Sequence, residues 1–125
     1  MPHILVLAVG HDPVLLETRG HVLQSAGYTV VLELSLKKVV DRFREGDFDL
    51  VLLCHSIPAR DREHLTQVLR EHTSRTPIVS VSTNLCDLDS FADAMVGNDP
   101  GELLVALREL LVANRAKLLD SRRWA

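Results

Sequence analysis

A cysteine and an arginine six positions apart are the residues of this chain whose types and spacing suit nucleophilic chemistry. Cys54 follows an apolar run, and Arg60 comes after five intervening residues. A thiolate can attack phosphorus, and a guanidinium nearby can hold the oxyanion. The intervening segment has no glycine, however, and Pro58 removes one backbone N–H from the loop that would have to wrap the anion. The spacing leaves open thiol-based phosphate hydrolysis or thiol redox chemistry on a poor anion cradle.

Four possible zinc ligands would gather at one edge of a parallel sheet. His11, Asp12, Cys54 and His55 follow the first and third apolar runs, and these runs would form neighbouring strands in a doubly wound sheet. Cys54 and His55 are consecutive, however, so they would start on opposite faces of a continuing strand. A metal-binding module at these residues is an alternative. The simpler interpretation takes Cys54 as a small buried apolar residue.

The strands that would position these residues are indicated by continuous apolar runs. Unbroken runs are typical of strands covered on both faces. Helical patterns lie between them, and right-handed crossovers then predict an α/β fold, a doubly wound flavodoxin-like five-stranded parallel sheet in the order 2-1-3-4-5. The predicted strands are Ile4–Val9, Val30–Leu32, Leu50–Leu53, Ile78–Val81 and, more weakly, Ala94–Val96.

Capping residues mark the helices. The first is predicted over Pro13–Ala26, because Asp12 is an N-cap that precedes a proline and Gly27 is a suitable C′ stop. Ser35 is predicted to cap a second helix, which ends at Gly46. Two further helices are predicted, one around Leu65, Val68 and Leu69 and one from the capping box Asp99-Pro100-Gly101-Glu102 onward.

Length and composition indicate one domain over residues 1–125, with a tail, 115–125, that frays or docks on a partner. Apolar residues make up 46% of the chain and aromatics only 4%, as in parallel-sheet proteins with aliphatic cores. The formal net charge of −3 does not favour binding to nucleic acid or to an anionic membrane. No basic leader or membrane-spanning run is visible, so a cytoplasmic location with reduced cysteines is predicted.

The segment Asp49–Asp61 resembles the third strand and following turn of response-regulator receiver domains. Within it, Ile57-Pro-Ala-Arg-Asp61 resembles the family's Met-Pro-Gly-x-Asp turn. Pro77–Ser82 resembles its fourth strand, which ends on a Ser or Thr that contacts the phosphoryl group, and Ser82 fills that place. The resemblance covers Ile4 to about Ala113 and implies the receiver fold and a bacterial two-component phosphorelay.

The residues that perform phosphoryl transfer in that family are replaced. Cys54 stands where receivers carry the acceptor aspartate. The first strand ends without the family's acidic pair, since only Asp12 is acidic and it is better explained as a helix cap. Met95–Asp99 lacks the family's Lys. Magnesium prefers oxygen ligands, and a thiolate is a soft ligand. Phosphoryl transfer would therefore lack its acceptor, its metal ion and the lysine that stabilises the phosphoryl charge.

These replacements predict an atypical receiver domain, a pseudo-receiver, that is not an enzyme and uses no cofactor or metal. Cys54 is the position equivalent to the phosphoacceptor, and Asp12 and Ser82 are other vestigial positions. Signalling would then depend on contact with another protein. The alternatives are a cysteine-dependent phosphatase or thiol redox protein using Cys54 and Arg60, and the metal-binding module.

The connection between the last two strands is short. Met95 comes thirteen residues after Ser82, and a helix rises about 1.5 Å per residue, so the helix that the family places here should be shortened or absent. The helix from Pro100 would then expose apolar surface, which predicts a homodimer or a hetero-complex through it. The leucines considered too many for the short connection to cover are Leu103, Leu107, Leu110 and Leu111.

Overall fold

The computed structural model describes residues 4–73, 75–82, 91–97 and 99–123, with side chains up to residue 113. They form one five-stranded parallel sheet in the order β2-β1-β3-β4-β5, which confirms the predicted architecture and topology. The strands are β1 Leu5–Val9, β2 Thr29–Glu33, β3 Leu50–Leu53, β4 Ile78–Ser82 and β5 Ala94–Gly97.

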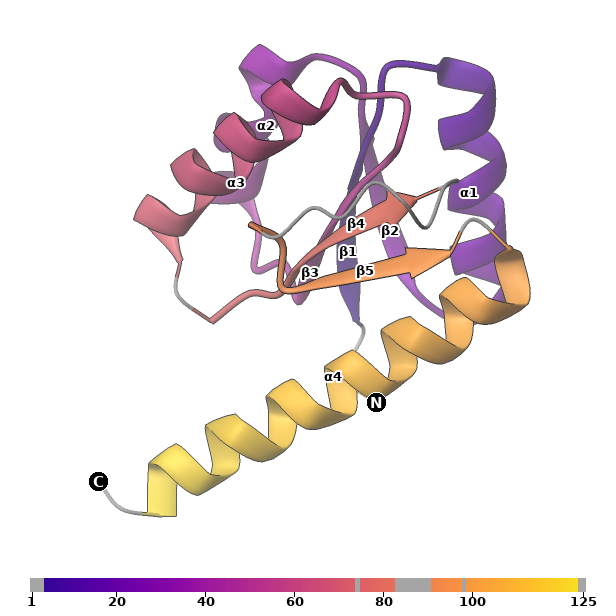
Figure 1. Cartoon of the computed structure of the whole chain (residues 1–125). Coiled ribbons are helices and arrows are strands. Elements are labelled where there is room, and N and C mark those ends of the chain that lie inside the picture. Colours follow the sequence, from indigo (N-terminus) through magenta and orange to yellow (C-terminus); the bar gives the residue numbers. More distant parts are fainter. Residues whose placement is uncertain (1–3, 74, 83–90, 98, 124–125) are drawn as a thin grey trace.

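Helices cover both faces of the sheet (Figure 1). Leucines of α1 and α4 pack with one side of the strands into one core, and apolar residues of α2 and α3 pack with the other side into a second core. Coverage on both faces explains why the strands are continuously apolar. The helices are α1 Pro13–Ser25, the short 3-10 helix η1 Leu36–Lys38 that leads into α2 Val39–Glu45, α3 Ala59–His72 and α4 Pro100–Arg123.

The predicted caps of the first and last helices are confirmed. Asp12 Oδ1 accepts hydrogen bonds from the N–H groups of Val14 and Leu15 at 3.0 and 3.3 Å. Gly27 has φ +95°, a left-handed conformation that glycine adopts without strain, directly after the end of α1. Asp99 Oδ2 accepts from the Glu102 N–H at 3.1 Å at the start of α4.

The second helical segment begins after Ser35 and ends before Gly46, as predicted, and the Lys38 N–H donates to the Ser35 carbonyl at 3.1 Å. The predicted side-chain cap is wrong, because the Ser35 hydroxyl makes no capping bond and η1 precedes α2. Glu33, at the end of β2, accepts two hydrogen bonds at this turn: its Oε2 accepts from the Ser35 N–H at 2.9 Å and its Oε1 from Arg42 Nε at 3.2 Å.

Replacing Glu33 with glutamine should destabilise the fold by about 1–2 kcal/mol at neutral pH, since two charge-assisted hydrogen bonds weaken. Burial alone would raise the pKa of Glu33, but the bonds from Ser35 and Arg42 outweigh it and hold the pKa below its ordinary value. This contribution is therefore present above the unfolded pKa and is lost as the pH falls through the lower folded value. Urea unfolding of both proteins at neutral and acidic pH tests this, and an equal difference at both would contradict it.

The shortened connection lies mainly outside the described residues. The predicted loss of a helix falls on 83–90, and the described residues 91–93 are not helical. The expectation that the short connection leaves leucines of α4 uncovered is wrong for Leu103 and Leu107, which are buried. Leu110 and Leu111 are half-buried and pack against the core shared with α1.

Among the described side chains of α4, which extend to residue 113, two valines form the exposed apolar stripe. Val105 is 59% exposed and Val112 is 63% exposed, and their spacing of seven residues places them on one side of the helix. Within the described residues, no helix combines the length and the apolar character needed to cross a bilayer.

Candidate functional site

The three residues predicted to mark a vestigial site lie at the carboxyl edge of neighbouring strands. Cys54 directly follows β3, Ser82 ends β4, and Asp12 comes three residues after β1 ends at Val9. β1 pairs with β3 and β3 with β4, so the ends of these strands are adjacent. The Cys54 N–H donates to the Val9 carbonyl at 2.9 Å, which holds the thiol-bearing residue in line with the sheet.

This edge is filled by protein atoms around Gly10. A side-chain carbon built on Gly10 would come within 3.2 Å of Ser56 Oγ, 3.3 Å of Cys54 Cβ and 3.4 Å of Leu16 Cδ1. Ser56 Oγ is held in place because it accepts hydrogen bonds from the N–H groups of His11 and Asp12, at 2.9 and 3.4 Å. A larger side chain at position 10 would therefore require these neighbours to shift by a few tenths of an ångström.

The charges near this edge are mainly positive. Arg19 of α1 and Arg62 of α3 are buried, and Arg62 Nη1 donates to the Ile57 carbonyl. Burial lowers the pKa of His55, and the positive charges of Arg19 and Arg62 lower it further, against the opposite effect of Asp12. These effects favour the neutral form of the His55 imidazole. Two guanidinium groups do not favour a divalent cation at this edge.

Sequence reasoning missed both buried arginines. Arg19 lies between Leu16 and Leu23 at helical spacing, and Arg62 precedes Leu65 at the same kind of spacing. A charged residue within an apolar helical stripe was the available signal. It is weak because a long arginine can also extend to water from such a position.

The geometry is unfavourable to the phosphatase alternative. Cys54 is 2% exposed, and burial raises the pKa of its thiol to about 11 against the opposing charge of Arg19. Arg60, at the second position of α3, is exposed. A nucleophilic cysteine needs an accessible thiolate beside its anion cradle, and this pair provides neither.

Cys54 should react with a water-soluble disulfide reagent at least about 100-fold more slowly than free cysteine at neutral pH, because a buried thiol with a raised pKa yields little thiolate. The measurement uses a Cys86→Ala variant, so that Cys54 is the reporting thiol. Denaturant should restore the ordinary rate. Rapid reaction of the folded protein would contradict the burial and return the thiol-chemistry alternatives to consideration.

The metal-binding alternative is not supported either. Among the described residues, no three metal-ligating side chains come together, although His11, Asp12, Cys54 and His55 are all described. The Asp12 carboxylate caps α1, and the thiol of Cys54 is enclosed by the core shared by α1 and α4. These residues are close in sequence in two pairs, but their side chains do not point to a common metal position, because each is held in a different environment.

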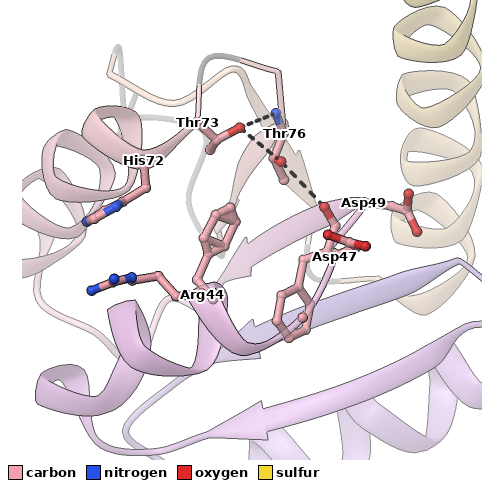
Figure 2. A pocket seen from close by; sticks show the side chains of 9 residues that line it. Arg44, Asp47, Asp49, His72, Thr73 and Thr76 are labelled. Carbon is pink, nitrogen blue, oxygen red and sulfur yellow. Dashed lines mark hydrogen bonds between the residues drawn. The ribbon is translucent and has the colours of Figure 1, made fainter.

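A cleft of about 420 Å³ lies at the opposite, amino edge of the sheet (Figure 2). Arg44 and His72 line it together with Asp47 and Asp49, so its charges are mixed. Its two threonine hydroxyls are occupied. Thr73 Oγ1 donates to Thr76 Oγ1 at 3.2 Å, and Thr76 Oγ1 donates to the Phe48 carbonyl at 3.4 Å. Neither hydroxyl is positioned as an activated nucleophile.

Comparison with known proteins identifies the fold. No protein-family model matches the chain, and no curated protein does. The signal receiver domain of an HD domain-containing protein from Pseudomonas fluorescens is 17% identical, with a TM-score of 0.79 over 94% of this chain and 93% of that one. The receiver domain of the TMAO respiratory system response regulator TorR is 26% identical, with a TM-score of 0.74 over 90% and 98%.

A third solved structure is the response regulator TrrA from Thermotoga maritima in complex with Mg²⁺ and BeF. It is 22% identical, with a TM-score of 0.73 over 86% of this chain and 98% of that one. The chain thus has the flavodoxin-like fold of response-regulator receiver domains, as the resemblance around Cys54 predicted.

Proposed function

We propose that this chain is a pseudo-receiver: a signalling domain that acts by contact with another protein and is not phosphorylated on an aspartate. The observation that carries the proposal is the buried Cys54 at the end of β3, with Gly10 packed against it. A phosphoacceptor must be an accessible carboxylate next to a metal ion, and this position is neither acidic nor open.

The solved neighbour TrrA is in complex with Mg²⁺ and BeF. In this chain Gly10 and Cys54 would offer no carboxylate oxygen to such an ion, and the buried Arg19 and Arg62 oppose its charge. We therefore propose that the carboxyl edge holds neither the metal nor a phosphoryl group. The chain then has no catalytic role of its own.

The exposed side of α4 is the partner-binding surface in this proposal. Val105 and Val112 are exposed although the neighbouring leucines of the same helix are buried or half-buried. Two large apolar side chains on one helix side favour contact with a partner. The partner is a signalling protein or, if the domain dimerises through α4, a second copy.

The experiment is incubation with acetyl phosphate and Mg²⁺, followed by intact-mass measurement. No phosphoryl adduct is expected, whereas a functional receiver treated in parallel should gain one. A stoichiometric adduct on this chain that persists in the Cys54→Ser variant would place an acceptor elsewhere, and one that disappears in that variant would make Cys54 the acceptor. Either adduct contradicts the proposal.

A further inference from the structure

We infer that β2 pairs antiparallel with the β2 of a second copy, joining two five-stranded sheets into one continuous sheet. This inference does not rest on the proposed function. It concerns the end of the sheet opposite β5 and an interface separate from the exposed stripe of α4.

The outer edge of β2 pairs with no other strand among the residues that the structure describes. β2 is the terminal strand of the sheet and pairs with β1 on its inner side. The Thr29 N–H donates to the Ile4 carbonyl at 2.9 Å, and the Glu33 carbonyl accepts from the Gly10 N–H at 3.2 Å, so these residues direct their backbone groups toward β1. Backbone direction alternates along a strand, so the N–H and C=O groups of Val30 and Leu32 face outward.

This edge lacks the usual features that prevent pairing. Native edge strands are commonly blunted by a lysine, a proline or an unpaired charge. The four residues Thr29–Leu32 contain none of these, and the one charge in β2, on Glu33, is buried and paired with Arg42. Large apolar side chains also remain exposed here, with Leu32 40% exposed and Leu34 44% exposed.

The strand is complementary to itself, which is why a second copy is the partner that fits. If a two-fold axis passes through Val31, Val30 of one copy faces Leu32 of the other, and the converse pair forms as well. The backbone N–H and C=O groups of Val30 and Leu32 point away from β1. Each Val30–Leu32 pair between the two copies can therefore exchange two backbone hydrogen bonds. The side chains of Val30 and Leu32 lie on the face of the sheet that α1 covers, whereas that of Val31 lies on the other face. Leu32 packs directly against α1, because a Cβ atom added to Gly20 would lie 3.2 Å from Leu32 Cδ2. The pairing thus joins apolar residues with apolar residues on that face.

The expected association is weak. One strand pair buries less than the roughly 800 Å² per partner of a standard interface, so we expect a dissociation constant of about 10–100 µM. An isologous contact of this kind closes at a dimer.

A cysteine at the axis tests the register directly. Val31 would lie opposite its own symmetry mate in a non-hydrogen-bonded pair with Cα atoms about 4.5 Å apart, within the roughly 4.4–6.8 Å that a disulfide spans. In a background with Cys54→Ala and Cys86→Ala, Val31→Cys should form a disulfide-linked dimer in a glutathione redox buffer at about 100 µM protein. Thr29→Cys should stay monomeric, because the second copy's Glu33 would face it.

Sedimentation equilibrium of the otherwise unmodified chain provides the second measurement. Leu32→Lys should weaken self-association at least tenfold, while Val14→Lys, at an exposed valine in the first turn of α1, should leave it unchanged. Circular dichroism establishes that each variant is folded. A monomer up to several hundred micromolar, or equal cross-linking of Thr29→Cys and Val31→Cys, would overturn the inference. Cross-linking of Val105→Cys in place of Val31→Cys would assign the dimer to α4 instead.

Discussion

Replacing Cys54 with aspartate is expected to destabilise the fold by about 2–4 kcal/mol and to leave the protein without a phosphoryl adduct. The carboxylate would stand at a position that is 2% exposed, inside the apolar core shared by α1 and α4. Arg19 offsets part of the cost, as its effect on the thiol pKa indicates. The aspartate would still not be phosphorylated, since Gly10 supplies no ligand for a metal ion.

Urea unfolding and intact-mass measurement after treatment with acetyl phosphate and Mg²⁺ test the two halves of this prediction. Cys54→Asn is the matched control, because asparagine has nearly the same shape as aspartate but no charge. It should lower the free energy of unfolding by less than Cys54→Asp does. Adding Gly10→Asp should lower stability by roughly a further 1–3 kcal/mol through overpacking against Ser56 and Leu16. A Cys54→Asp protein that is fully stable and becomes phosphorylated would show that the edge is open after all.

The double variant Val105→Asp, Val112→Asp is expected to lower partner binding through α4 at least tenfold while changing the free energy of unfolding by less than about 0.5 kcal/mol per site. Both side chains are mostly exposed, so the charges remain in water in the free protein. Leu111→Asp is a poorer probe, because Leu111 packs against the core and its replacement would also weaken the fold.

Quantitative capture of partners from the native host, with the unmodified chain and the double variant as bait, measures this effect. Val14→Asp is the matched control, since it adds a charge at an exposed valine on α1. Partners that depend on α4 should be depleted with the double variant and retained with the control. If both variants capture the same proteins as the unmodified chain, the α4 surface is not the binding site.

The sheet was predictable because its strands are covered on both faces. Every predicted strand agrees with the structure to within one residue at each end, including the weak run at Ala94. Local capping chemistry was equally informative at Asp12 and Gly27. The bounds of the second helix were predictable from Ser35 and Gly46, but the serine makes no side-chain capping bond, and the carboxylate of Glu33 that bonds the Ser35 N–H and Arg42 was not predicted.

The common location of Cys54, Asp12 and Ser82 was predictable, and the charge around them was not. Topology alone places Cys54, Asp12 and Ser82 at the same edge. The positive environment comes from Arg19 and Arg62, which are on helices at opposite faces of the sheet and are far apart in sequence. The amino-edge cleft was equally hidden, because its walls come from two segments, 43–49 and 72–76, that only the tertiary structure brings together.

The length of α4 has a mechanical consequence. The helix runs from Pro100 to Arg123, and its far end projects beyond the strands (Figure 1), while Leu103 and Leu107 anchor its near end in the core. At about 1.5 Å per residue it is roughly 36 Å long, so a tilt of about 10° at the anchored end would move the far end by about 6 Å. A partner bound near the far end would therefore be displaced by several ångströms, while the packing at Leu107, about 6 Å along the helix from Leu103, would shift by about 1 Å. Helix α4 would then amplify small movements at the core into larger movements at its far end.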